Sequence, residues 1–400
     1  QPPPPQIRLQ IMNRFLLLPR HVRSITTSTS SRSVTRRTHA MFGGVATQRS
    51  SLLRQHQRSF ADASPRESVT VAVPATSANM GPGFDTIGMA LNVWNTMTVE
   101  RSDKLEIHVK GEGQGKVPVD DSNLVVFGVK TAFKHAGEEM PPLRFKCHNR
   151  IPFARGLGSS SAGIVAGLLA GLVLSGKEVP VWGSETFLQM ACEIEGHPDN
   201  VAPAIYGGIQ LGMNNGERWI SSRVQTPHGL QAIIFIPESI GETKAARAVL
   251  PETLTYKEAV YNISRISFLV NALNTNNLYD LQWATQDALH QPQRSAQFSH
   301  MRPVIEAAME AGAHCAYLSG AGPSILALTS SAAGDVFTQR QEERNEQAVA
   351  DAMAKAAEVN GTPGRIFITE PTQRGAHVLQ ASPSFSDKGR IHLFREAGEV

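Results

Sequence analysis

The 400-residue sequence has few cysteines and no long apolar run, and each absence excludes a class of protein. Its three cysteines, Cys147, Cys192 and Cys315, form no CxxC pair and no cluster with histidine, which argues against a disulfide framework or a zinc site. We therefore expect reduced, buried thiols. The longest apolar run, Ile164 to Leu174, is interrupted by glycine and is shorter than the ~20 residues that a membrane-spanning helix needs, so we expect no membrane span.

Acidic residues are nearly absent from the first 66 positions. This segment holds eleven arginines, no lysine and one acid, Asp62, for a net charge of +10, so the other residues must carry −7 to give the total of +3. A stretch rich in Arg, Ser and Thr and poor in acids is typical of an organelle transit peptide. The alternative is a disordered basic arm that binds an acidic partner. We expect residues 1–66 to be a transit peptide or disordered leader, with a plastid favoured over a mitochondrion.

The remaining chain lacks a basic patch with interleaved aromatic residues, which argues against a nucleic-acid partner. Its periodicity predicts strands at 105–111, 143–152 and 230–237 and helices at 122–137 and 256–275. Strands and helices alternate in clumps rather than as regular βαβ units, which indicates an α+β fold. A change in composition at residues 214–230 predicts a boundary between two domains, 67–225 and 226–400.

Two common phosphate-binding motifs are also missing. The string "GEGQGKV" lacks the spacing of GxxxxGK[ST], and Ser161 stands where GxGxxG needs its third glycine. The sequence has "PFARGLGSSSAG" (152–163) instead. Gly156 and Gly158 let the backbone approach a ligand, and the helix that follows directs its N-terminal N–H groups toward it, which favours phosphate. Taken alone, this loop could equally be a simple helix cap.

Three further segments are also rich in glycine and other small residues, namely "PATSANMGPGFDTIG" (74–88), "EIEGHPDNVAPAIYGG" (193–208) and "SGAGPSI" (319–325). Together with "GLGSSSA" they resemble the motifs of the GHMP kinases, whose phosphate loop reads PxxxGLGSSAA. The chain departs from that pattern at Ser161, where alanine is usual. The resemblance covers residues 68–380. It implies a ribosomal-protein-S5-like N-terminal domain, a ferredoxin-like α/β sandwich as C-terminal domain, and a homodimer.

The resemblance also implies ATP and Mg²⁺. The residues expected at ATP are Pro152, Arg155, Gly156, Leu157, Gly158, Ser159, Ser160, Ser161 and Ala162 of the loop, and Asn123, which could instead only cap a helix. The metal ligands carried over from the family are Ser160 and Glu193, with Glu195 as the alternative acid. Hydroxyl and carboxylate oxygens are the hard ligands that Mg²⁺ prefers.

Within the family, the first and middle segments resemble those of members that phosphorylate L-homoserine in threonine biosynthesis. Asn79 and Asp85 are then expected to hold the α-ammonium group, unless they only form an Asx turn. Thr243, Arg247 and Arg294 are expected at the α-carboxylate, because the planar fork of arginine suits two carboxylate oxygens. The alternative for each arginine is an ordinary surface position.

The expected reaction transfers the γ-phosphoryl group of ATP to the side-chain hydroxyl. Mevalonate-type relatives carry a catalytic Asp where this chain has Asn200, which can orient a hydroxyl but cannot take its proton. Positioning and charge neutralisation can drive such a transfer. We therefore expect no dedicated base, with Asp199 as the rival candidate and His197 and His314 as structural residues. Two other hypotheses stay open: a kinase for another small alcohol, and a non-catalytic nucleotide-binding regulator.

Overall fold

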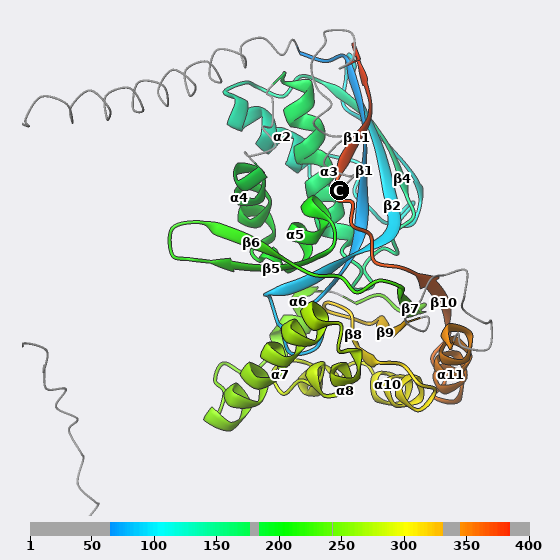
Figure 1. The fold of residues 1–400 in the computed structure, drawn as a ribbon. Coiled ribbons are helices and arrows are strands. Elements are labelled where there is room, and N and C mark those ends of the chain that lie inside the picture. The colour runs from blue at the N-terminus through cyan, green and yellow to red at the C-terminus, as the bar shows by residue number, and fades with distance from the viewer. Residues whose placement is uncertain (1–64, 177–183, 242, 331–344, 385–400) are drawn as a thin grey trace, which may run out of the picture. The chain divides into compact units, whose positions relative to one another are not determined.

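The computed structural model describes residues 65–176, 184–241, 243–330 and 345–384, which lie in one compact unit, Asp62–Val400 (Figure 1). The predicted leader, residues 1–66, falls almost entirely outside the described residues. Along the chain, runs of strands alternate with runs of helices, and the strands form two mainly antiparallel sheets. The α+β prediction is therefore confirmed. Within the described ranges, no helix is both long and apolar enough to cross a bilayer.

Seven strands form the first sheet, and β2 is its longest member. The main path runs β11-β1-β2-β4-β3, while β5 pairs with the early part of β2 and β6 pairs with β5. The β3–β4 pairing is parallel and the other described pairings are antiparallel. The strands are β1 (Ser68–Ala78), β2 (Ile87–Arg101), β3 (Glu106–Gly111), β4 (Leu143–Asn149), β5 (Ile209–Asn214), β6 (Trp219–Val224) and β11 (His377–Ser382).

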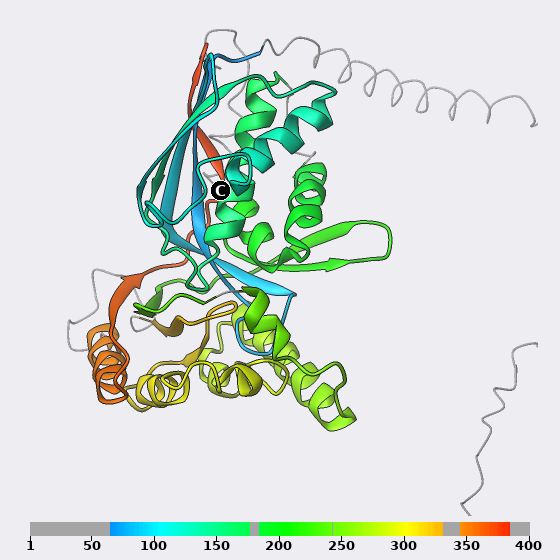
Figure 2. The same cartoon turned by 180° about the vertical axis from the view of Figure 1, so that it is seen from behind.

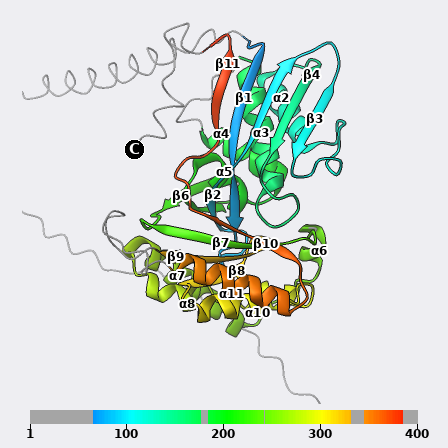
Figure 3. The same cartoon turned by 90° about the vertical axis from the view of Figure 1, so that its right-hand side faces the viewer.

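Four helices cover one face of this sheet, as Figures 1 and 3 show: α2 (Leu124–Ala136), α3 (Ser159–Leu174), α4 (Ser184–Glu195) and α5 (Pro198–Tyr206). Helix α3 lies deepest, with almost all of its side chains buried. Its small residues permit the close contact with α2 that the sequence suggests. A Cβ on Gly167 would lie 2.2 Å from the carbonyl oxygen of Val125, so this crossing requires glycine.

The second sheet has four antiparallel strands in the order β10-β7-β9-β8. They are β7 (Leu230–Pro237), β8 (Cys315–Leu318), β9 (Ile325–Ser330) and β10 (Gly364–Thr369). Helices α10 (Met301–Glu310) and α11 (Glu346–Val359) pack on it and share a separate apolar core with it. Figure 2 shows these helices from behind. The other helices here are α6 (Thr243–Ala248), α7 (Tyr256–Thr275), η2 (Leu278–Asp280), α8 (Leu281–Ala284) and α9 (Gln291–Arg294).

Regular periodicity predicts the elements well, and glycine- or proline-rich segments mislead. The strand at 230–237 and the helix at 256–275 are confirmed at both ends. The glycine- and proline-rich segment 193–208 contains helix α5, because Pro198 stands in the first turn, where its missing N–H costs nothing. The segment 74–88 likewise contains the end of β1, which continues past Pro74 through a shift in register.

The chain ends its described part back on the first sheet, because β11 pairs with β1. The linker between β6 and β7 falls at the predicted boundary of 225 and 226, and the bounds of the two domains, 67–225 and 226–400, stay a prediction. All three cysteines are free and buried, as expected. Burial raises the pKa of Cys147 to about 11 and the pKa of Cys192 and of Cys315 to about 12, which keeps the thiols protonated.

Candidate functional site

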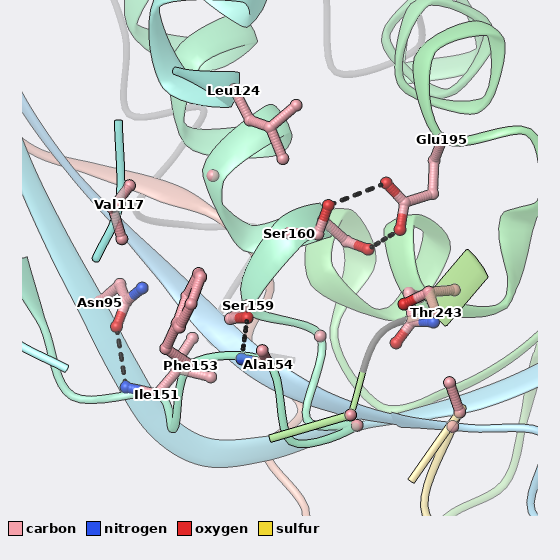
Figure 4. Close-up of a pocket in the computed structure, with 18 of the residues that line it drawn as sticks. Asn95, Val117, Leu124, Ile151, Phe153, Ala154, Ser159, Ser160, Glu195 and Thr243 are labelled. Carbon is pink, nitrogen blue, oxygen red and sulfur yellow. Dashed lines mark hydrogen bonds between the residues drawn. The ribbon is translucent and has the colours of Figure 1, made fainter. Parts of the chain in front are cut away.

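A cavity of about 610 Å³ lies between the loop that precedes α3 and the loops of the four-stranded sheet (Figure 4). Its walls come from segments as far apart in the sequence as Asn79 and Ala321. Most residues singled out from the sequence line it: Asn79, Asp85, Asn123, Gly156, Gly158, Ser159, Ser160, Ser161, Asp199, Asn200, Thr243, Arg247 and Arg294. The fold therefore brings the separate motifs to one place.

The loop between β4 and α3 is held so that the first turn of α3 opens into this cavity. The side-chain oxygen of Asn95 accepts hydrogen bonds from the backbone N–H groups of Arg150 and Ile151, at 2.8 and 2.9 Å. Gly158 precedes the helix in the left-handed region and makes no side-chain cap. No capping side chain therefore accepts a hydrogen bond from the N–H groups of the first turn, which face the cavity. Free N–H groups at a helix start are suited to binding an anion.

Gly158 cannot be replaced without displacing the loop. Its φ is +69°, and a Cβ there would lie 1.9 Å from Oγ1 of Thr76. Thr76 in turn donates a 2.7 Å hydrogen bond to the side-chain oxygen of Asn200. The phosphate-type loop is thus fixed directly against strand β1 and helix α5.

Four loop residues expected at ATP have side chains that point away from the cavity. Leu157 and Ala162 are buried in the apolar core, and Pro152 lines a different pocket. The guanidinium group of Arg155 donates to three backbone carbonyls, including that of Pro237. Their contact with ATP stays a prediction, and it would have to come from the backbone, because neighbouring residues of a tight loop face opposite sides. They hold the loop in shape.

The acid that faces the loop is Glu195, and Glu193 as metal ligand stays a prediction that its position does not favour. Glu195 accepts hydrogen bonds from Ser161, at 2.7 Å, and from Ser160, at 3.5 Å (Figure 4). Glu193 is exposed and lies outside the cavity lining. Two residues apart on α4, the two side chains point in nearly opposite directions. Burial raises the pKa of Glu195, while the hydrogen bond from Ser161 acts against that shift.

One end of the cavity is apolar. Val117, Leu124 and Phe153 lie around it beside the start of α2 (Figure 4). Asn123 borders this end, but its side chain caps α2 by accepting from the N–H of Val125, at 2.9 Å, and donates to the carbonyl of Pro118, at 2.6 Å. The helix-cap alternative for Asn123 is therefore confirmed, and its contact with adenine stays a prediction.

The other end of the cavity is charged. Asp85 and Arg247 form a two-pronged ion pair at 2.7 and 2.8 Å. Asn79 supports the Asp85 loop, because its side-chain oxygen accepts from the N–H of Asp85, at 3.0 Å, and its amide group donates to the carbonyl of Gly320, at 2.9 Å. Asn79 and Asp85 have φ of +68° and +57°, a strained conformation that often marks functional loops.

Arg294 contributes a second cation at this end, and it is buried, at 1% exposure. Burial, and then the charge of Arg247, lowers the pKa of Arg294 to about 10. The ring of Phe84 is within cation–π distance of both guanidinium groups, with its centroid 5.2 Å from Cζ of Arg247 and 5.4 Å from Cζ of Arg294. The electron-rich ring attracts both cations, which repel each other.

Asp199 and Asn200 lie at the start of α5, between the two ends of the cavity. Asp199 is buried and bonded to the ring of His197. Burial disfavours the charged imidazole, yet the hydrogen bond and charge of Asp199 outweigh it and raise the pKa of His197. His197 also lines the cavity, and its structural role stays a prediction. His314 lies elsewhere, bonded to Ser330.

Two oxygen-rich groups could hold a metal ion. Asp85, His197 and Asp199 offer ligand atoms within 4.8 Å of one another, but Arg247 and the Asp199–His197 pairing already engage them. The hydroxyls of Ser160 and Ser161 and the carboxylate of Glu195 form an all-oxygen set beside the N-terminus of α3. This second set fits Mg²⁺, which prefers few protein ligands together with phosphate oxygens.

The sequence interpretation overlooks Phe84, Thr76 and His290, which contact predicted site residues. Phe84 could have been found, since it directly precedes Asp85 in a motif already singled out. Thr76 lies in the same motif, but its role depends on a contact with Asn200, 124 residues away, that only the folded chain defines. His290 lies four residues before Arg294, so a helical turn at that arginine would have pointed to it.

The comparisons with known proteins agree with this geometry. The model of the GHMP kinases N terminal domain matches residues 123–208, and that of the GHMP kinases C terminal domain matches residues 271–359. A homoserine kinase of Moorella thermoacetica is 41% identical over 64% of this chain and 86% of its own length. A homoserine kinase of Desulfitobacterium hafniense is 37% identical over 78% of this chain and 100% of its own length.

A solved structure is also similar. The crystal structure of homoserine kinase from Cytophaga hutchinsonii superimposes with a TM-score of 0.68 and 29% identity, covering 79% of this chain and 98% of that one. The expected two-domain GHMP kinase fold is therefore confirmed.

Proposed function

Because this chain belongs to the GHMP kinase family and matches its homoserine kinases, we propose that it transfers the γ-phosphoryl group of ATP to the side-chain hydroxyl of L-homoserine. The products are O-phospho-L-homoserine and ADP. The observation that carries this proposal is the single cavity with an anion-binding helix start near one end and two arginines with an aspartate at the other. One end suits phosphates and the other suits a zwitterion.

The amino-acid end is paired internally until a ligand enters. Asp85 and Arg247 bind each other, so an α-ammonium and an α-carboxylate can exchange into this pair with both charges still compensated. Arg294 supplies the additional cation, and among the described residues no carboxylate lies within ion-pairing distance of it. Thr243, at the start of α6, adds a hydroxyl at the same rim.

Mg²⁺ fits the set of Ser160, Ser161 and Glu195, with Glu195 in the role first expected for Glu193. When bound, the metal would neutralise charge on the β- and γ-phosphates. The chain's own residues then orient the groups that react. The N–H groups at the start of α3 stabilise phosphate charge, and Ser160 and Glu195 are already aligned by hydrogen bonds.

Catalysis proceeds without a dedicated base. Thr76 donates to the side-chain oxygen of Asn200, so the amide nitrogen of Asn200, which also donates a 3.4 Å bond to Oδ1 of Asp199, is the group that can orient an acceptor hydroxyl. Asp199 is hydrogen-bonded to the ring of His197, and this bond, against the effect of burial, raises the pKa of His197. The ring of His197 and the amide nitrogen of Asn200 already contact Oδ1 of Asp199, which weakens the rival role for Asp199.

Two alternative functions would need fewer of the residues that line the cavity. A kinase for another small alcohol would not need both arginines and Asp85, and a silent regulator would not need Ser160, Glu195 and the loop glycines.

We also propose import into an organelle, with a plastid favoured, because of the arginine-rich leader. A homodimer, usual in the family, is proposed as well.

The test is an ADP-release assay on the full chain with ATP and Mg²⁺. Homoserine, serine, threonine and mevalonate serve as acceptors. We expect clear preference for homoserine, since its hydroxyl, ammonium and carboxylate match the three groups of the cavity. Equal or better turnover of another acceptor would replace homoserine as the substrate, and ATP binding without transfer to any acceptor would favour the regulator.

A further inference from the structure

The second arginine of the amino-acid end is held by groups that carry no charge. Arg294 donates from Nε to the carbonyl of Ala246, at 3.0 Å, and from Nη1 to the carbonyl of Gly320, at 3.0 Å. Its third partner is Nδ1 of His290, 3.1 Å from Nη1. The direction of the guanidinium group is thus set by α6, by the loop after β8, and by one histidine.

The two ring nitrogens of His290 have different kinds of partner. Nε2 lies 2.8 Å from the carbonyl oxygen of Gly81, which can only accept a hydrogen bond, and Nδ1 faces Arg294, which can only donate one. One protonation state satisfies both contacts. It is the neutral ring with its proton on Nε2, in which Nδ1 keeps a free lone pair for Arg294.

Asp287 fixes the backbone of His290 but is not a competing partner for its ring. The carboxylate of Asp287 accepts from the N–H groups of Leu289, His290 and Gln291 and from the side-chain amide of Asn262, at 2.7 to 2.9 Å. Nε2 of His290 lies 3.6 Å from the same carboxylate, farther than from Gly81. These contacts leave Nδ1 as the only side-chain acceptor that the structure describes for Arg294.

We propose that His290, in its neutral form, is a positioning residue that directs Arg294 toward the α-carboxylate of the amino-acid substrate. The proposal rests on the proposed function, and it adds the residue that sets the orientation of the carboxylate-binding arginine. His290 itself touches no substrate, because it is fully buried behind Phe84 and Arg294. Its effect therefore appears in substrate affinity and not in the chemistry of transfer.

The charges around His290 determine the pH range in which its ring is neutral and can accept from Arg294. Burial lowers the pKa of His290 and the Arg294 charge acts in the same direction, while Asp287 and, more weakly, Asp85 act against them. The ring is neutral at pH 7. Acid protonates Nδ1, which removes the acceptor for Arg294 and places two cations side by side.

The experiment compares two substitutions that separate the two ring nitrogens. In H290N the amide oxygen takes the place of Nδ1 and can accept from Arg294, while in H290Q the amide nitrogen takes the place of Nε2 and can donate only to Gly81. KM for homoserine, KM for ATP, kcat and Tm are measured for the full chain. We expect H290Q to raise the homoserine KM about tenfold, since a hydrogen bond to a charged group is lost, and H290N to raise it less than about threefold.

A pH series provides the second measurement. The wild-type homoserine KM is expected to rise in acid, at a pH below the ordinary histidine pKa of about 6.5, since the lowered pKa of His290 delays its protonation, and the H290N value is expected to rise less over the same range. Equal KM values for the two variants, or a homoserine KM that follows Tm alone, would overturn the proposal. Failure of the wild-type chain to use homoserine would instead contradict the proposed function, so the two failures are distinct.

Discussion

The two ends of the cavity are built from different parts of the chain. At the nucleotide end, the proposed ligand meets backbone N–H groups and apolar side chains from one continuous loop and the two helices beside it. At the amino-acid end, it meets charged side chains from four separate segments, represented by Asp85, Arg247, Arg294 and His197. The first end depends on local backbone shape, whereas the second depends on long-range assembly, and the two should respond differently to substitution.

The largest effect should follow a change in the backbone of the nucleotide end. In G158A the new Cβ would lie 1.9 Å from Oγ1 of Thr76, which forces the loop away from the start of α3. We expect kcat/KM to fall on the order of a thousandfold, because several N–H groups move together. Steady-state kinetics with ATP and homoserine measure the loss.

G115A is the matched control for this substitution. Gly115 has a similar φ of +74°, but a Cβ there meets no atom within 4 Å. It therefore carries the cost of the left-handed conformation alone, about 1 kcal/mol of stability, with activity unchanged. Similar activity losses in both variants would mean that backbone strain, and not the position of the loop, limits the enzyme.

The next effect distinguishes the two acids of α4. E195Q removes the charge that accepts from Ser160 and Ser161, and we expect kcat to fall on the order of a hundredfold, with a higher Mg²⁺ requirement. E193Q changes an exposed residue outside the cavity and should stay within about twofold. A Mg²⁺ titration of kcat checks both. A larger loss in E193Q would restore Glu193 as the metal ligand.

A smaller effect is expected between the two ends, where the phosphoryl group transfers. D199N keeps the shape of the side chain but removes its charge, and kcat should fall less than about tenfold if no base is needed. The homoserine KM should change little, because Asp85, Arg247 and Arg294 keep their contacts. A drop in kcat of about a thousandfold with unchanged KM would identify Asp199 as the base.

The same contrast explains how much of the molecule could be predicted from the sequence. The loop at 156–161 is predictable because its function resides in a short string of glycine and serine whose backbone geometry is local. The strands and helices with clear periodicity are predictable for the same reason. The fold class and the family follow from those motifs.

The rest depends on contacts that a sequence does not display. Glu193 and Glu195 are equally acidic and two positions apart, and only the orientation of α4 decides which one faces Ser161. The pairing of Asp85 with Arg247 joins residues 162 positions apart. Helix α5 escapes prediction because its prolines argue locally against a helix, although Pro198 occupies the first turn, where proline is tolerated.

The smallest predicted effect concerns stability in acid and contrasts the two halves of the chain. Burial lowers the pKa of His290, His300 and His314, all beside or within the four-stranded sheet region, whereas the pKa of His197 is raised despite its burial, by Asp199. In the unfolded chain each of these histidines has the ordinary pKa of about 6.5. Below that pH the unfolded chain therefore binds protons more readily than the three buried rings of the folded chain do. Their contribution to stability is present above pH 6.5 and is lost as the pH falls below it.

His197 acts in the opposite sense, since its contribution is present below pH 6.5 and is lost as the pH rises through its raised pKa. Because three histidines lose their contribution to stability in acid and only one gains it, we expect a lower Tm at pH 5.5 than at pH 7.5. H314Q changes a position outside the cavity and removes one titrating ring, while the glutamine amide can still reach Ser330. It should make the drop in Tm smaller, by about 2–4 °C for each kcal/mol of pH-dependent unfolding free energy that it removes. Calorimetry at the two pH values checks it. An equal fall in H314Q and the wild type would mean that acid acts through other groups, and the contrast between the two halves would not extend to their histidines.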